Sequence, residues 1–156
     1  MTTESAHFRL PRAMRRRLRR DPVLRRWLAA WVGGSALGVA NGVVRELAYK
    51  DRVGKVAANQ ISTGSLIALL AAYFWILDRR WPIPTAQTAL IIGAAWAVLT
   101  VLFEVGFGRY ADRKSWSELL ENYNVAEGQT WTFALIWIGF GPLLVRAARR
   151  SGRWPV

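Results

Sequence analysis

Four long apolar stretches divide the chain, and polar or strongly basic segments separate them. The stretches lie at about residues 27–46, 60–77, 85–107 and 130–146. A helix that crosses a bilayer needs about 20 mostly apolar residues, because it rises about 1.5 Å per residue through about 30 Å of hydrocarbon. The pattern therefore predicts an all-α protein, an integral membrane four-helix bundle formed by residues 27–146.

The segments between the stretches contain helix-breaking residues. Residues 47–59 are expected to form a polar loop, and residues 78–84 a tight turn with two prolines. The fourth stretch has about 17 residues, which is the lower limit for crossing a bilayer. Its Gly139, Gly141 and Pro142 predict a kink or an early exit from the membrane.

The longest connection, residues 109–129, carries a helix signal of its own. Ser115 and Glu118 have the spacing of a capping box. The apolar side chains that follow lie on one face of a helix: Trp116, Leu119, Leu120 and Tyr123. A short helix with one apolar face is expected to lie along the membrane surface rather than to cross it.

Positive charge is concentrated on one side of the predicted bundle. The chain has 22 Lys and Arg against 10 Asp and Glu, a net charge of +12. With four spans both termini lie on one side. The leader 1–26, the turn 78–84 and the tail 147–156 put most of the cations there. The positive-inside rule predicts that this side is cytoplasmic and meets anionic lipids. Orientation also explains the arginines without a nucleic-acid partner.

Several kinds of chemistry lack their usual residues. The chain has no cysteine and a single histidine, His7. Disulfides and thiol nucleophiles are therefore excluded, and zinc, haem and Ser-His-Asp sites are not expected. We predict neither a metal nor a cofactor.

Two of the predicted helices carry matching stripes of small and polar residues. In each stripe the spacing is 4, 3, 4, which places the residues on one helix face. The stripes consist of Gly34, Gly38, Asn41 and Arg45 in the first helix and Gly93, Ala97, Thr100 and Glu104 in the third. Gly42 extends the first stripe. Small residues at this spacing let helices approach closely in lipid, so we expect the two stripes to pack together.

The charged ends of the two stripes are predicted to lie at the same depth, near the outer edge of the hydrocarbon. Because both stripes face the bundle, Arg45 is expected to pair with Glu104. Glu46 and Arg109 would form a second, outer pair. Further polar residues near this depth are Asn41, Thr100, Gln60, Ser62 and Thr63.

Two interpretations of this polar cluster remain open at this point. In one, the cluster holds two helices in register. In the other, it lines an outward-facing pocket for a lipid headgroup, a quinone-like ring or an acidic solute, and a desolvated Glu104 carries a proton.

Tryptophan is abundant, with nine residues. Most lie at predicted span ends, where aromatic belts occur in membrane proteins: Trp27, Trp81, Trp116, Trp131 and Trp154. Trp96 and Trp137 lie in the middle of spans and are expected to pack in the core or against lipid. They are the two tryptophans at which ligand contact is worth testing.

Three motifs resemble those of a family of small four-helix bacterial inner-membrane proteins without a known activity. They are Asn41-Gly42-x-x-Arg45-Glu46, Phe103-Glu104-x-x-Phe107-Gly108-Arg109-Tyr110 and a run from Ser115-Trp116 through Tyr123-Asn124 to Trp131. The resemblance covers residues 27–146 and implies a bacterial inner-membrane location. The preference for Arg over Lys also suits a GC-rich genome.

These features favour a small polytopic membrane protein without enzymatic activity. It would bind a lipid or a partner membrane protein, including a second copy of itself, through the outer polar cluster. A small transporter or channel subunit, with Glu104 and Arg45 on the path, is the alternative. An enzyme acting on a lipid or quinone ranks last, because no metal set, nucleophile–base pair or phosphate loop is visible.

Overall fold

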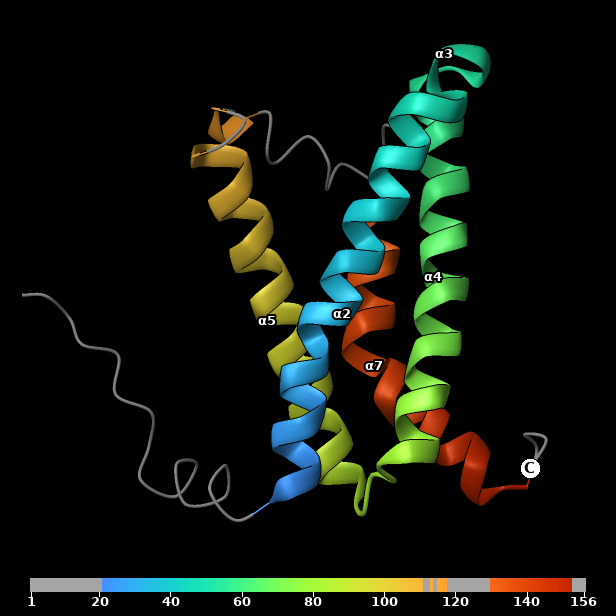
Figure 1. The fold of residues 1–156 in the computed structure, drawn as a ribbon, viewed down its shortest axis with the longest axis vertical. Helices are drawn as coiled ribbons and strands as arrows, with labels where there is room; N and C mark the ends of the chain where they lie inside the picture. Colours follow the sequence, from blue (N-terminus) through green and yellow to red (C-terminus); the bar gives the residue numbers. More distant parts are fainter. Residues whose placement is uncertain (1–20, 111–112, 114, 118–129, 153–156) are drawn as a thin grey trace, which may run out of the picture.

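The computed structural model describes residues 21–110, 113, 115–117 and 130–152 (Figure 1). Within these residues the protein is all-α, without β-strands. Four helices are long and apolar enough to cross a bilayer, which is the make-up of a multi-pass membrane protein. The elements are α2 (Pro22–Val44), the π-helix η1 (Arg45–Tyr49), α3 (Lys50–Val53), α4 (Lys55–Arg80), α5 (Ala86–Tyr110) and α7 (Trp131–Arg150).

The first long helix, α2, begins earlier than the predicted span because Asp21 and Pro22 form a helix start. The Asp21 side chain accepts hydrogen bonds from the backbone N–H groups of Val23 (3.0 Å) and Leu24 (3.2 Å). Pro22 suits the first helical position, where no backbone donor is needed. Residues 22–26 of the predicted leader are therefore helical.

The predicted polar loop at residues 47–59 is wrong. The chain stays helical through η1 and α3, and α4 starts directly after Gly54. An ion pair of 2.6 Å joins Glu46 and Lys50, one turn apart, and favours the helical conformation here. Gly54 breaks the helix with a φ of +83°, which a residue without a Cβ adopts readily.

The last helix, α7, does not end early. It continues through Pro142 to Arg150, although the proline removes one backbone donor. Gly141 and Pro142 are both buried, and Gly141 lets the Phe74 ring lie directly against the helix. The helix ends at Arg150, and Gly152 follows the cap residue Ser151 with a φ of +65°.

The helices follow one another around the bundle in the order α2, α4, α7, α5, so that α7 lies diagonally across from α2. The closest packing is between α5 and α7. At their crossing, a Cβ added to Gly93 would overlap the carbonyl oxygen of Gly139. The predicted packing of Gly93 against the first helix is therefore wrong, because α7 offers its own glycine at the crossing. Ala97 is partly buried against the core.

Three large aromatic side chains form the core nearer the end where α2 begins. Trp27, Phe74 and Trp96 are almost completely buried, and their ring centroids are 5.0–6.4 Å apart. The indole of Trp27 donates to the Trp81 carbonyl (3.0 Å), and the indole of Trp96 donates to the Trp27 carbonyl (2.9 Å). Trp27 thus belongs to the core, and its prediction as part of an aromatic belt is wrong.

The start of α2, the turn between α4 and α5 and the end of α7 lie at the same end of the bundle, called the basic end below (Figure 1). Asp78 is buried there, with 1% of its surface exposed. Its carboxylate accepts hydrogen bonds from the Ile83 backbone N–H (2.9 Å) and from Arg149. The ion pair of Asp78 with Arg149, which was not predicted from the sequence, joins the α4–α5 turn to the end of α7.

Some predictions concern residues outside the described ranges. The surface helix after Ser115 falls largely on residues 118–129, and parts of the leader and tail fall on residues 1–20 and 153–156. Which end of the bundle faces the cytoplasm also stays a prediction.

Replacing Gly93 by alanine is expected to destabilise the bundle by about 2 kcal/mol or more, because the added methyl group meets a backbone carbonyl that cannot rotate away. Thermal unfolding in detergent measures the effect. Gly64→Ala is the matched control, since a Cβ there meets nothing within 4 Å. Equal stability of the two variants would contradict the close contact of α5 and α7.

Replacing Asp78 by alanine is expected to cost about 2–3 kcal/mol. The Ile83 N–H loses its buried acceptor, while Arg149, whose side chain is 38% exposed, can still reach water. Chemical denaturation of detergent-solubilised protein measures the loss. Asp51→Ala, at an exposed carboxylate, is expected to change stability by less than about 0.5 kcal/mol.

Candidate functional site

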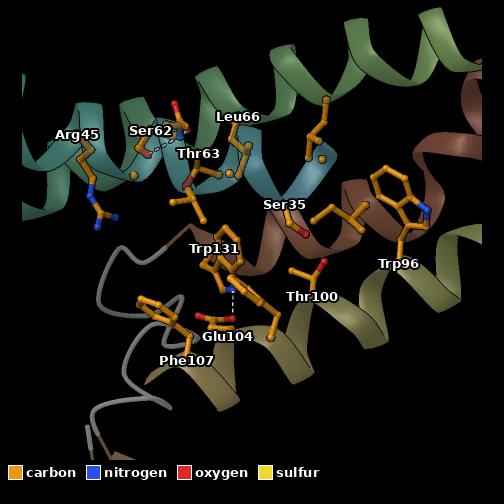
Figure 2. Close-up of a pocket in the computed structure, with 18 of the residues that line it drawn as sticks. Ser35, Arg45, Ser62, Thr63, Leu66, Trp96, Thr100, Glu104, Phe107 and Trp131 are labelled. Carbon is orange, nitrogen blue, oxygen red and sulfur yellow. Dashed lines mark hydrogen bonds between the residues drawn. The ribbon is translucent and has the colours of Figure 1, made fainter. Parts of the chain in front are cut away.

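A cavity of about 370 Å³ lies inside the bundle, towards the end opposite the basic end, and all four long helices line it. Figure 2 shows many of its lining residues. The lining residues are Trp31, Gly34, Ser35, Gly38, Val39, Asn41, Gly42 and Arg45 from α2 and η1. They also include Asn59, Ser62, Thr63, Leu66 and Leu70 from α4, Trp96, Thr100, Phe103, Glu104, Phe107 and Gly108 from α5, and Trp131 and Ile138 from α7.

The character of the lining changes along the bundle axis. Figure 2 shows Trp96 at one end of the cavity and Arg45, Glu104 and Phe107 at the other. The inner end, next to the aromatic core, is apolar. The other end, called the polar end below, carries opposite charges on facing walls, with Arg45 on one and Glu104 on the other. Such a cavity suits a molecule with a polar head and an apolar body.

The glycine stripe of α2 keeps this cavity open. A Cβ added to Gly38 or Gly42 would meet nothing within 4 Å, whereas one added to Gly34 would lie 2.6 Å from the Trp96 ring. The predicted packing role thus applies to Gly34 alone in this stripe, and its partner is a side chain rather than a glycine face. Gly38 and Gly42 instead leave space where larger residues would fill the bundle.

Arg45 is held by neighbours on its own wall. Its Nη1 donates to the Asn59 side-chain oxygen (2.9 Å), and its Nη2 lies 2.9 Å from a Glu46 carboxylate oxygen. Its Nε is out of contact with solvent and has no hydrogen-bond acceptor among the described residues. The residue begins η1, and π-helical turns of this kind are frequent at functional sites.

Glu104 lies across the cavity from Arg45, and the predicted ion pair between them is wrong. Its carboxylate accepts a hydrogen bond from the Trp131 indole (2.8 Å). Within the described residues, the ion pairs of Arg45 and Glu46 are with each other and, for Glu46, with Lys50. The two helices diverge towards this end, so equal depth does not bring the two charges into contact (Figure 1).

The other predicted members of the cluster divide into two groups. One group lines the cavity: Asn41, Ser62, Thr63 and Thr100. Glu46, Gln60 and Arg109 are exposed and lie outside it, within the part of the chain that the structure describes. The predicted pair of Glu46 with Arg109 is also wrong, since Glu46 pairs with Arg45 and Lys50 instead. The Arg109 guanidinium lies over the Trp116 ring, 5.2 Å from its centroid.

Asn41 connects α2 to α4 at the side of the cavity. Its side-chain nitrogen donates to the backbone oxygen (2.8 Å) and the hydroxyl (2.7 Å) of Ser62. Its side-chain oxygen accepts from the Ser65 hydroxyl (2.8 Å). A further hydrogen bond, from Thr130 to Thr63 (2.8 Å), connects α4 to the start of α7. These bonds position the polar wall without involving either cavity charge.

Aromatic rings line the cavity beside α5. Trp31 donates from its indole to the Thr100 hydroxyl (3.2 Å) and lies edge-on to Phe103, with ring centroids 6.1 Å apart. Phe103 and Phe107 are stacked at 5.9 Å. With Trp131, which donates its hydrogen bond to Glu104, these rings give this part of the cavity an aromatic lining.

Several of these residues were missed by the sequence analysis, although a signal for some of them was present. Asn59, Leu66 and Leu70 were not predicted. Together with Thr63, which was predicted, they have the same 4, 3, 4 spacing as the glycine stripe, and all four line the cavity. Trp131 was assigned to an aromatic belt. Its indole hydrogen bond depends on the position of α5, which no spacing reveals.

The comparisons with known proteins give no further guide to this site. No protein-family model, no curated protein and no solved structure matches the chain. The motif resemblance to small bacterial inner-membrane proteins therefore stays a prediction. In the part of the chain that the structure describes, no three His, Asp or Glu side chains are grouped as metal ligands.

Replacing Asn41 by alanine is expected to destabilise the protein by about 1–2 kcal/mol, because three hydrogen bonds between α2 and α4 are lost and polar interactions in membrane bundles average about 0.6 kcal/mol each. Unfolding in detergent measures the loss. Gln60→Ala removes an amide from an exposed position of α4 and serves as the control. A loss of the same size there would show that the connecting hydrogen bonds are not what stabilises this wall.

Proposed function

We propose that this chain is a multi-pass membrane protein that binds an amphiphilic molecule of the lipid class in the cavity between its four helices. One observation carries the proposal: a single cavity of about 370 Å³ joins a charged, hydrogen-bonding end to an apolar end. Its size is within the usual range of small-molecule sites. Most of the polar side chains that line it are held by hydrogen bonds to their neighbours, as is usual at a binding site.

The surface around the cavity supports entry from the bilayer. Phe103 and Phe107 line the cavity, and both are about half exposed, with 42% and 54% of their surface accessible. The cavity therefore reaches the outside of the bundle beside α5. An acyl chain can pass between these rings into the hydrocarbon while the headgroup stays among the polar side chains.

The charge distribution supports one orientation for this function. The basic end carries exposed arginines, and two of them stack on tryptophan rings: Arg26 on Trp81 (5.7 Å) and Arg79 on Trp75 (4.6 Å). Stacked arginines beside a membrane suit the anionic lipids of a cytoplasmic leaflet. We place the basic end in the cytoplasm of a bacterium, the bundle in its inner membrane and the polar end of the cavity in the outer leaflet.

The packing favours binding over conduction. Between the cavity and the basic end lie the buried rings of Trp27, Phe74 and Trp96, followed by the buried pair of Asp78 and Arg149. A polar solute would have to displace both layers to cross the bundle. The same packing makes a transporter the weaker alternative.

Filling the cavity tests the proposal. Gly38→Leu places a side chain in the open space of the cavity, so it is expected to displace a bound amphiphile while the helices keep their positions. Gly64→Leu adds the same side chain at an exposed position of α4 outside the cavity. Native mass spectrometry of gently extracted protein is expected to find a bound lipid-class molecule on the wild type and on Gly64→Leu, and to find its occupancy at least about tenfold lower on Gly38→Leu.

Two results would overturn the proposed function. One is a wild-type protein that carries no lipid-class molecule after gentle extraction and takes up none when lipid is added back. The other is equal occupancy in Gly38→Leu and Gly64→Leu, which would place the bound molecule outside the cavity.

A further inference from the structure

We infer that the bound amphiphile is an acyl-ester lipid, and that an ester carbonyl oxygen of this lipid lies between the hydroxyl groups of Ser35 and Thr100. This inference rests on the proposed function and specifies the chemical class of its ligand. It is carried by two hydroxyl groups that face each other from α2 and α5, at a level between the two ends of the cavity.

The Thr100 hydroxyl has a hydrogen-bond donor that is not used within the described part of the chain. A threonine hydroxyl donates one hydrogen bond and also accepts hydrogen bonds. Thr100 accepts from the indole N–H of Trp31 (3.2 Å), and no acceptor for its own hydrogen is found among the described residues. Because Thr100 is half-buried and lines the cavity, an oxygen atom of a ligand in the cavity can accept this hydrogen.

The Ser35 hydroxyl is in the same situation on the opposite wall. Serines inside helices often donate to a carbonyl of the preceding turn, as Ser65 does to Ser62 (3.0 Å). Ser35 makes no hydrogen bond to any residue that the structure describes. It is half-buried, lines the cavity, and its oxygen is not enclosed by protein atoms. This hydroxyl is therefore a second donor that a ligand can reach.

The two donors converge on one place. Figure 2 shows the hydroxyl groups of Ser35 and Thr100 directed towards each other across the cavity, although no hydrogen bond joins them. A carbonyl oxygen has two lone pairs and accepts from two donors at once. A carbonyl oxygen between Ser35 and Thr100 would therefore satisfy both hydroxyl groups.

The level of this pair along the bundle favours an ester lipid. Figure 2 places Ser35 and Thr100 between Trp96 at the apolar end of the cavity and Glu104 at the polar end. In a glycerolipid the ester carbonyls likewise lie between the headgroup and the acyl chains. A prenyl quinone carries its carbonyls on the head itself, so it would leave the polar end of the cavity without a ligand group.

The cavity also offers a path for the acyl chains at this level. Val39 of α2 and Phe103 of α5 both line the cavity, and 51% and 42% of their surfaces are exposed. The opening to the bilayer thus lies between the two helices that carry the hydroxyl groups. The chains can remain in the bilayer, so the volume of about 370 Å³ has to hold only the headgroup and the ester linkage.

A comparison of ester and ether lipids tests the inference. The full-length protein, depleted of lipid in detergent, is titrated with diester phosphatidylglycerol and with its diether analogue, which has the same headgroup and the same chain lengths. Native mass spectrometry reports the occupancy of each lipid. The wild type is expected to prefer the diester by about tenfold, because the diether lacks the carbonyl acceptors. The shared headgroup removes any charge contact from the comparison.

Substitutions assign this preference to the two hydroxyl groups. Ser35→Ala and Thr100→Val are each expected to lower the preference to about threefold or less, whereas Thr100→Ser keeps the hydroxyl and is expected to retain it. Thr100→Val also removes the acceptor of Trp31, so this variant is the one that can fail to fold. Ser35→Ala removes no hydrogen bond between described residues and keeps the test decisive.

Two control variants remove the same groups outside the cavity. Thr132→Val matches Thr100→Val at a half-buried position of α7, and Ser151→Ala matches Ser35→Ala at the exposed end of that helix. Both controls are expected to keep the wild-type preference for the diester. Loss of the preference in either control would place the recognition of the ester outside the cavity and overturn the inference.

The remaining outcomes separate the inference from the proposed function. Equal wild-type binding of the diester and the diether would overturn the ester assignment, and so would an undiminished preference in Ser35→Ala. The proposed function would survive either result provided that Gly38→Leu still lowered the occupancy of both lipids. Displacement of the bound diester by an equimolar prenyl quinone would assign the cavity to a quinone and overturn the inference. Binding of neither lipid would overturn the proposed function as well.

Discussion

The contact between the backbones of α5 and α7 at Gly93 and Gly139 is the constraint on which the rest of the bundle depends. Association of helices in a bilayer relies on close packing, since lipid chains are as apolar as the side chains they replace. Two glycines facing each other let these helices approach until backbone meets backbone. Because α5 packs its glycine face against α7 at this crossing, that face is not available to pack against the whole length of α2.

The cavity results from the packing of α5 against α7 rather than against α2. Near the basic end, α2 is held by the aromatic core of Trp27, Phe74 and Trp96, whose rings fill the space between the helices. Beyond Trp96, α2 presents Gly38 and Gly42, which are too small to fill the space left as α5 diverges. The cavity therefore forms because large side chains fill the bundle near the basic end, whereas small residues of α2 leave it unfilled beyond Trp96.

The helix faces could be predicted from the sequence, but their partners could not. The spacing of Gly34, Gly38, Asn41 and Arg45 indicates one inward face, and all four line the cavity. The same spacing cannot say whether Gly93 meets the first helix or Gly139, because both offer small residues. For the same reason depth alone could not decide the partner of Arg45. Contact across a bundle depends on how far two helices diverge, which is set by packing elsewhere.

The sequence contains signals for the helix ends that the predicted spans did not use. Asp21-Pro22 is a helix start, and Gly54 is the residue at which the helical path breaks. Hydropathy located the apolar centre of each span but undervalued these local signals, so α2 and α4 extend further than the apolar stretches. The buried state of Asp78 had no local signal, because its partner Arg149 lies 71 positions later in the chain.

The long sequence separation of Asp78 and Arg149 has a consequence for biosynthesis. Residues 78–84 are made and inserted well before Arg149 leaves the ribosome, so the carboxylate of Asp78 must first lie at the membrane surface without its partner. Burial of this group, with its hydrogen bond to Ile83, is completed only when the last helix arrives. Closure of the basic end therefore requires α7, and a chain cut short before Arg149 would leave the Asp78 carboxylate without its ion-pair partner.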